Sequence, residues 1–411
     1  MTAAVDISSI AFWSRPFDER DLAFAMLRRE APVSWHPPLE TPGLPTRSRE
    51  HGFWAVTTAE HIRTVSRDSA RFSSALRQVS VRPVPYRLRP NMLVSDPPDH
   101  GLYRVALGSA FAPAALRART PAIERAVRQI VLRSTFRTGF DVVRDLAAPV
   151  PARVLALLLG VPDAELPRFL PALDAFASDS VPAGLGADEA ALGTWFAEQA
   201  AYLTGLTDDL LRFRAEHPAD DLLSLLAAGG REAGLSSEAL RSTVTLLLVA
   251  GHDTMKQLIG LSVLALLQHP EERERLLTDF DRRFDTAFDE LVRWATPVLS
   301  FARTATEDLT LGGARLRRGD KVALFYCSGN RDEQEFPEPR VLRLDRTPNR
   351  HLGFGGGGVH FCLGGTLARI ELRAVLGTLF AKAPDLALGG APTFGFNDAV
   401  HRLDALPVHR G

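Results

Sequence analysis

The amino-acid sequence predicts a mostly α-helical fold, a single large domain over residues 1–411 with small peripheral β-sheets. Long stretches place apolar residues at helical spacing, and runs of β-branched residues are few. The length alone would suggest two or three domains of about 100–200 residues each. However, no fixed repeat and no linker rich in serine, glycine or charge divides the chain, so one domain is favoured.

Two stretches carry their apolar residues on one side of a predicted helix. In Ile123–Phe136 these are Ile123, Val127, Ile130, Val131 and Phe136. Leu203–Phe213 repeats the pattern, and His217-Pro218 ends that helix.

The strongest helix signal runs from Ser237 to Gln268. Ser236 or Ser237 can cap its start, and His269-Pro270 ends it. At ~1.5 Å per residue such a helix spans roughly 45 Å, about the width of the molecule. It is apolar almost all round from Val244 to Ala250, so we expect it to cross the interior. The polar residues at its middle therefore need an explanation.

Strand-like stretches are short: Phe53–Thr57, Val322–Tyr326 and Ala405–Val408. Two irregular segments, Val79–Leu93 with its prolines and Ser178–Ala187 with its glycines, are typical of loops that cover a site or turn a corner.

Charge and cysteine content exclude several classes of function. Lys+Arg is 48 and Asp+Glu is 49, so the net charge of −1 leaves no electrostatic footprint for nucleic acid. The two cysteines exclude a disulfide scaffold and fit a reducing cytoplasm, where we expect the protein to act. The start of the chain lacks a signal peptide, and no apolar stretch reaches the ~18 residues of a membrane span, so we expect no membrane anchor.

The first chemical motif is the run from His351 to Gly364, HLGFGGGGVHFCLG, which allows three interpretations. It contains a formal GxGxxG match, but the preceding residues are not a strand, as a dinucleotide site requires. A zinc site on His360 and Cys362 lacks a second cysteine pair. In the third interpretation Cys362 is the single thiolate ligand of a haem iron, and the glycines let the backbone approach the porphyrin. The helix predicted from Leu363 onward would then favour the thiolate.

This run resembles the cysteine loop of bacterial cytochromes P-450, FGxGxHxCxG, with one extra residue in FGGGGVHFCLG. The resemblance covers nearly the whole chain, and the longer loop is similar to that of actinobacterial members that oxidise sterols and branched lipids. It implies the family's helical haem-binding fold and heme b (iron protoporphyrin IX) as cofactor. It also implies that Cys362 binds the iron and that Phe354 and Gly364 contact the cofactor.

The second motif, Ala250-Gly251-His252-Asp253-Thr254, lies at the middle of the long helix. The Thr254 hydroxyl can bond to the carbonyl of residue 250 and open the helix locally. Gly251 leaves room for a small ligand, and Asp253 can relay protons if it reaches water. An isolated motif of this kind would favour a purely structural role. The match to the family's acid–alcohol pair implies that Asp253 and Thr254 deliver protons to bound O2, that Gly251 gives it space and that Ala250 contacts the haem.

Further matches concern the structural core and the haem propionates. Glu290 and Arg293 lie three apart on one helix face among apolar residues, and the resemblance implies that they lock the core near the cysteine loop. Glu272–Arg275 has the same spacing and is expected to be only a solvated pair.

Propionates need cationic or hydrogen-bonding partners, and the resemblance assigns this task to His100, Arg104, Arg303 and His360. Cys327 is expected to be a small buried hydrophobe.

The function implied is a monooxygenase that inserts one oxygen atom from O2 into an apolar small molecule: a sterol, terpenoid, branched lipid or secondary metabolite. Residues in stretches that line the pocket in similar proteins are Val249, Val298, Leu299 and Phe396. Since no flavin or iron–sulfur motif is present, the resemblance implies a ferredoxin and a ferredoxin reductase as electron donors. Arg369 and Arg373 could form a basic docking face. We expect a monomer.

Three alternatives stay open. The same oxidant could drive oxidative coupling or rearrangement in a natural-product pathway. A peroxide-driven haem enzyme would not need the Asp253–Thr254 pair, which argues against it. A haem-based sensor without turnover predicts no large apolar pocket and no spectral shift with lipophilic compounds.

Overall fold

The computed structural model of the protein describes residues 5–40, 52–77, 79–82, 89–178 and 189–411. Of the two irregular segments expected near a site, residues 83–88 and 179–187 therefore lie outside the described residues.

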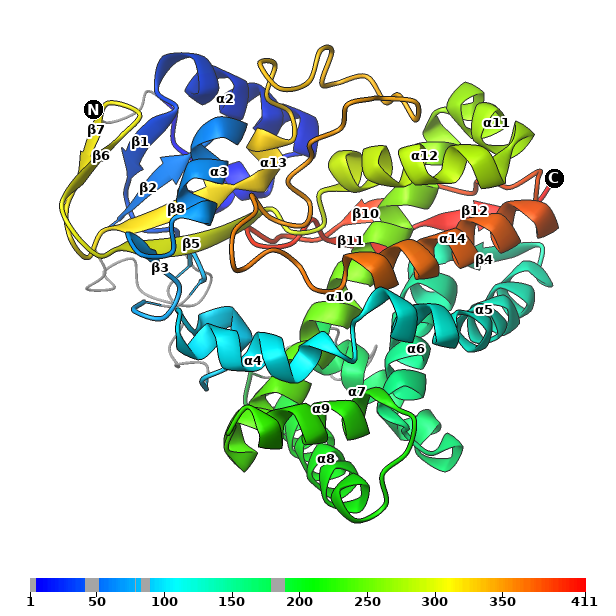
Figure 1. Ribbon diagram of the computed structural model, residues 1–411. Helices are drawn as coiled ribbons and strands as arrows, with labels where there is room; N and C mark the ends of the chain where they lie inside the picture. The colour runs from blue at the N-terminus through cyan, green and yellow to red at the C-terminus, as the bar shows by residue number, and fades with distance from the viewer. Residues whose placement is uncertain (1–4, 41–51, 78, 83–88, 179–188) are drawn as a thin grey trace.

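Helices dominate the described chain, which confirms the predicted fold class (Figure 1). Their bounds are α1 Ile10–Trp13, α2 Phe17–Glu30, α3 Ala59–Arg67, α4 Asp99–Gly108, α5 Pro113–Thr135, α6 Pro149–Leu159, α7 Leu166–Ser178, α8 Glu189–Glu216, α9 Leu222–Glu232, α10 Ser237–Gln268, α11 Pro270–Thr278, α12 Phe280–Ala295, α13 Tyr326–Gly329 and α14 Gly365–Lys382. The predicted helix Leu203–Phe213 falls inside α8, and Ile123–Phe136 falls inside α5 except for its last residue. Phe136 and Phe213, expected on the apolar sides, are exposed.

The long helix α10 has the predicted bounds. The Ser236 side chain accepts a hydrogen bond from the Ala239 N–H at 3.1 Å, and the helix ends before His269. It passes through the middle of the molecule, with α14 crossing it (Figure 1). The fully buried part is Met255–Leu266, whereas Val244–Ala250, expected to be the most buried part, has accessible positions. These positions are accessible because one face of the helix borders the candidate site.

Strands form one larger sheet and three small ones. The larger sheet has the order β1-β2-β8-β5-β3, in which β2 and β8 are parallel and the other neighbours antiparallel. The predicted strands near residues 53 and 322 are its β2 and β8. The strand bounds are β1 Val33–His36, β2 Phe53–Val56, β3 Phe72–Ser73, β4 Gly139–Asp141, β5 Ser300–Ala305, β6 Leu309–Leu311, β7 Ala314–Leu316, β8 Lys321–Phe325, β9 Ala387–Leu388, β10 Thr393–Phe394, β11 Leu403–Ala405 and β12 Pro407–His409.

The single strand predicted over Ala405–Val408 is wrong, because the chain changes sheets there. β11 pairs with β10, whereas β12 pairs with β4 and β9. The apolar alternation continues through Leu406 and does not reveal the change of partner.

The apolar core is divided between helices and sheet. The largest cluster of buried residues joins α5, α6, α10, α12 and α14, and two smaller clusters pack on the two sides of the larger sheet. In Figure 1 the sheet and the first helices lie to one side of α10, and α5 to α9 lie below and to the other side. Among the described helices, none has the length and apolar content needed to span a bilayer.

Candidate functional site

The cysteine loop runs directly into α14. The Cys362 N–H donates to the Phe354 carbonyl at 3.0 Å, which closes the loop on itself. Gly355, Gly357 and Gly358 have φ angles of 95°, 94° and 77°, values that favour glycine. A Cβ on Gly358 would lie 2.3 Å from the Ser66 carbonyl oxygen, so the loop lies directly against the end of α3. Glycine is thus required here by contact with the protein itself.

Cys362 has accessible surface, yet protein atoms enclose it closely enough that burial raises the pKa of its thiol. The N–H groups of Gly364 and Gly365 at the start of α14 and the charge of Arg104 act in the opposite direction and do not outweigh burial. Among the protein's own groups burial thus outweighs the helix contribution, and the thiolate form expected with the iron bound stays a prediction. The sulfur lies where an electrophilic partner can reach it.

The four predicted propionate ligands lie together beside this cysteine. The rings of His100 on α4 and His360 have their centroids 4.5 Å apart, and Arg104 Nη1 donates to the Phe361 carbonyl at 3.2 Å. Burial, together with the charges of Arg303, His100 and Arg104, lowers the pKa of His360 to about 3. Three separate parts of the chain thus direct cationic or donor groups at one place.

Among the described residues one nitrogen of this set has no hydrogen-bond partner and the buried arginine has no ion-paired carboxylate, while His360 Nε2 lies 3.0 Å from Ser74 Oγ. His100 Nε2 is buried without a hydrogen-bond partner. Arg303 on β5 is 4% exposed and donates to the carbonyl of its neighbour Ala302 at 2.8 Å. The nearby carboxylate of Asp96 accepts from Ser73 Oγ and from the Ser74 N–H at 2.7 Å. A buried guanidinium without an ion-paired carboxylate, next to a buried imidazole nitrogen without a partner, fits a ligand that brings carboxylates, as the propionates of haem do.

One face of α10 stays accessible at the middle of the molecule. Leu246, Ala250 and Thr254 lie at four-residue spacing, Ala250 is exposed and the other two are half-buried. Thr254 Oγ1 donates to the Ala250 carbonyl at 2.6 Å, the bond that its position in the motif predicts. This face therefore carries both a hydroxyl and a small residue toward open space.

Gly251 and Asp253 point in other directions. A Cβ on Gly251 would lie 3.1 Å from Leu155 Cδ2, so the structure gives this glycine a packing contact with α6. Its role in giving O2 space stays a prediction. Asp253 is half-buried, and its Oδ1 accepts a hydrogen bond from Gln257 Nε2 at 3.4 Å. The Oε1 of Gln257 in turn accepts from the Leu403 N–H at 2.8 Å, which ties the motif to β11.

Sequence reasoning missed a polar link between α10 and α7. His252 is fully buried, and its Nε2 lies 2.9 Å from Asp174 Oδ1, while Lys256 Nζ donates to the same oxygen at 2.7 Å. Burial acts to raise the pKa of Asp174, but His252 and Lys256 lower it well below its usual range. The available signal was a histidine and a lysine four residues apart in a buried helix.

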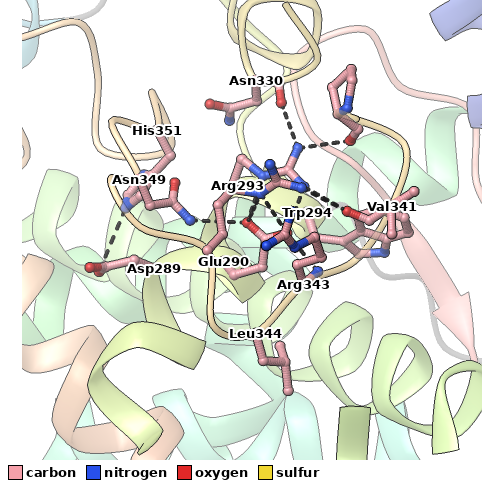
Figure 2. A network of polar contacts seen from close by, with 12 residues as sticks. Asp289, Glu290, Arg293, Trp294, Asn330, Val341, Arg343, Leu344, Asn349 and His351 are labelled. Carbon is pink, nitrogen blue, oxygen red and sulfur yellow. Dashed lines mark hydrogen bonds and ion pairs between the residues drawn. The ribbon is translucent and has the colours of Figure 1, made fainter. Parts of the chain in front are cut away.

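Glu290 and Arg293 on α12 form a fully buried pair with two contacts of 2.7 Å. Arg293 also donates to the carbonyls of Asn330 and Pro339 at 2.8 and 2.9 Å. Figure 2 shows this network, in which Glu290 also accepts hydrogen bonds from the segment that precedes the cysteine loop. One of them comes from Arg346 Nε at 3.1 Å, a partner that the sequence did not predict.

Glu272 is more than the solvated partner of Arg275 that its spacing predicted. Glu272 Oε1 lies 2.9 Å from Arg275, whose side chain is exposed. Its other oxygen, however, accepts a hydrogen bond from the Leu344 N–H at 2.8 Å.

The predicted pocket residues divide into two kinds. Val249, Val298 and Phe396 are half-buried, and Val298 forms a bridge with Val400 beside Phe396 in the last part of the chain. Leu299 is fully buried in the apolar cluster that packs on the larger sheet.

The remaining predictions concern arginines on α14 and the second cysteine. Arg369 pairs with Asp289 and Asp285 at 2.7 and 3.1 Å, and Arg373 pairs with Asp281 at 2.5 Å. The two arginines are thus paired with α12 and are not free positive charges.

Cys327 is buried, and burial raises the pKa of its thiol to about 12, as expected of a small apolar residue. It lies in α13, not in the preceding strand.

Comparisons with known proteins agree with one another. A family model described as Cytochrome P450 matches residues 205–382. The chain is 37% identical to the methyl-branched lipid omega-hydroxylase of Mycobacterium tuberculosis, over 99% of this chain and 94% of that protein. It is 33% identical to the steroid C26-monooxygenase of Rhodococcus jostii, over 90% of this chain and 77% of that protein. A solved Mycobacterium marinum cytochrome P450 in complex with pseudoionone is similar with a TM-score of 0.92 and 39% identity, over 100% and 99% of the two chains.

Proposed function

The chain belongs to the cytochrome P450 family, and on that premise we propose that it oxidises a methyl-branched or isoprenoid lipid. It is a monooxygenase, and its cofactor is heme b. When bound, the haem activates O2 so that one oxygen atom enters the substrate and the other leaves as water.

Our proposal for the haem site rests on one observation: beside an accessible cysteine lie a buried histidine nitrogen without a partner and a buried arginine without an ion-paired carboxylate. Cys362 supplies the thiolate ligand, and His100, Arg104, Arg303 and His360 bind the propionates. Ala250, Phe354 and Gly364 complete the contacts around the cofactor. Glu290 and Arg293 act only through the structure, because both side chains are fully buried in their network.

For the proton supply we propose the acid and the alcohol of α10. Thr254 lies on the accessible face of the helix and donates to the Ala250 carbonyl, so its oxygen is held at a fixed position. Asp253 is half-buried, so it can exchange protons with water and pass them on to Thr254. Gln257 holds one oxygen of Asp253.

The proposed substrate class draws on the relatives and on the apolar side chains. Val249, Val298 and Phe396 are apolar and half-buried, which supports contact with an apolar ligand. The relatives are called a methyl-branched lipid omega-hydroxylase and a steroid C26-monooxygenase. Both names describe oxidation of a lipid, which supports an apolar lipid substrate for this chain.

The test is a titration of the purified holoenzyme that follows the haem Soret band. Methyl-branched fatty acyl esters, isoprenoid ketones and sterols should shift the band, whereas aromatic peptides should not. A shift with the peptides alone would overturn the proposed substrate class.

As redox partners we propose a ferredoxin and its reductase, since the family draws its electrons from outside and the sequence contains no flavin or iron–sulfur motif. We further propose that the chain is a single domain over residues 1–411, acts as a monomer and works in the cytoplasm. The two free cysteines support a reducing compartment.

A further inference from the structure

Residues 79–82 lie against the larger sheet. The Val79 carbonyl accepts a hydrogen bond from the Ala302 N–H of β5 at 2.7 Å, and the Val81 carbonyl accepts from Lys321 Nζ of β8 at 3.1 Å. Both valines are buried. The segment is therefore held on β5 and β8 as far as Val81, and Arg82 is the next residue.

Arg82 meets the last part of the chain at a predicted pocket residue. Its Nη2 forms an ion pair with Asp398, and its guanidinium lies 5.2 Å from the centre of the Phe396 ring. Asp398 is 4% exposed, and its carbonyl accepts from Ser300 Oγ at 2.9 Å. The ion pair is thus held from both sides, next to an aromatic ring.

Most of the hydrogen-bonding capacity of Arg82 is unused. A guanidinium has several N–H donors, and in Arg82 only Nη2 reaches an acceptor among the described residues, while Nε is buried without a partner. Arg293, the structural arginine, instead uses all three of its nitrogens on carbonyls and a carboxylate. The Arg82 side chain is 26% exposed, so part of it is open to a ligand. Such a group can bind a ligand without losing a bond that it already makes.

The charge of the pair selects the kind of ligand. Asp398 already neutralises Arg82, and a second carboxylate next to it would be repelled by the first. An uncharged acceptor, such as the carbonyl oxygen of a ketone or an ester, can take the free N–H donors without that repulsion. The apolar part of the same ligand would extend along Phe396.

We propose that Arg82 is a specificity-determining residue that binds the carbonyl oxygen at the uncharged polar end of the lipid substrate, and that Asp398 sets the preference for uncharged over anionic ends. This inference rests on the proposed function, since it concerns the polar end of the proposed substrate. It assigns substrate recognition to an ion pair between residues 316 positions apart in the sequence.

Three lipids with one branched chain and different ends test the proposal: a methyl ester, the free acid and the hydrocarbon. Dissociation constants come from the shift of the Soret band of the holoenzyme. The wild type should bind the ester more tightly than the acid. In Arg82→Met the affinity for the ester should fall by about tenfold or more, the loss of a hydrogen bond to a charged group, and that for the hydrocarbon should not change. Equal losses for all three lipids would overturn the role of Arg82.

Asp398→Asn provides the second arm. Removal of the carboxylate leaves the charge of Arg82 unpaired, so the affinity for the free acid should rise at least about tenfold while that for the ester stays the same. An acid affinity that does not rise contradicts the role given to Asp398. Arg153→Met is the matched control, because Arg153 is also an ion-paired arginine with a 25% exposed side chain, and it lies on α6. Its affinities for the three lipids should be those of the wild type.

The carbon monoxide spectrum and circular dichroism check that each variant is a folded holoenzyme. If none of the three lipids shifts the band of the wild type, the proposed substrate class fails and the role of Arg82 fails with it. If the wild type binds all three but does not distinguish their ends, only the inference about Arg82 fails.

Discussion

At the scale of single residues, an unused hydrogen-bond donor in a buried place is the most informative feature of this protein. Among the described residues, His100 Nε2 and Arg82 Nε have no hydrogen-bond partner, although Arg82 Nη2 contacts Asp398. Arg303 donates to the carbonyl of its own neighbour, Ala302. A buried donor without an acceptor costs free energy. We propose that ligands satisfy these donors: the haem propionates for His100 and Arg303, and the substrate for Arg82.

Arg303 provides a direct test of the propionate assignment. Arg303→Leu removes a buried charge that has no carboxylate partner of its own, so the protein fold should tolerate it. Haem retention should fall, because one propionate loses a charged partner worth about 1.5–3 kcal/mol. The ratio of Soret to protein absorbance and the rate of haem transfer to apomyoglobin measure the effect. Unchanged haem retention would remove Arg303 from the set.

Thr254 tests the proposed proton supply. Thr254→Ala keeps the accessible face of α10 but removes the hydroxyl that is held on the Ala250 carbonyl. Product formed per electron pair should fall and hydrogen peroxide should rise in proportion, because loss of a positioned proton-transfer group slows the protonation step by at least about a hundredfold. Thr245→Ala, which removes a similar threonine bonded to the Arg241 carbonyl on the same helix, is the matched control. Full coupling in Thr254→Ala would contradict the role.

Residue types that match a family motif could be predicted from the sequence, whereas their long-range partners could not. Arg346 lies 56 positions from Glu290 in the sequence, and Asp174 lies 78 from His252. Local spacing carries no information about such pairs. The reason for the glycines of the cysteine loop was also hidden, because Ser66, the residue they contact, lies far upstream.

At the scale of elements, α10 shows which boundaries a sequence can define. A serine cap and a His-Pro stop mark both ends, so its bounds were predicted correctly. Its burial was predicted less well, because hydropathy does not distinguish a face packed on protein from one that borders a ligand site. The single strand predicted near residue 405 was wrong for a related reason, because an alternating apolar pattern does not show which strand will be the partner.

The link between α7 and α10 predicts a dependence of stability on pH. His252 and Lys256 lower the pKa of Asp174 below its ordinary 3.8, so the link stabilises the fold above that pH and is lost as pH falls through the lowered value. Asp174→Asn should therefore destabilise the protein by about 2 kcal/mol at pH 7, with a smaller difference at the lowest pH at which the protein still folds. Urea unfolding of holoenzyme at several pH values measures this. A difference that grows toward acid pH would have the wrong sign.

At the scale of the whole molecule, the buried network around Glu290 joins α12 to the long segment that leads into the cysteine loop (Figure 2). Two arginines, a backbone N–H and an amide converge on one carboxylate that is fully buried. Buried charges are tolerated only when they are paired, as Glu290 is with Arg293 and Arg346. The network holds the loop in place from outside the site.

Glu290→Gln tests this role. The substitution keeps the shape but leaves two buried guanidinium groups without a negative partner, so stability should fall by about 3–5 kcal/mol. Thermal unfolding and haem content measure the effect. Glu272→Gln, in a pair of the same spacing whose arginine is exposed, should lose far less. Similar losses in both variants would contradict the special role of the network.

The central claim, that the sulfur of Cys362 binds the haem iron, is tested most directly by the spectrum of the reduced holoprotein with carbon monoxide. The wild type and Cys327→Ala should both give the red-shifted band of a thiolate-bound haem, because Cys327 is buried away from the site. Cys362→His should retain haem and give the band of a nitrogen-bound haem. A thiolate band that persists in Cys362→His would contradict the account.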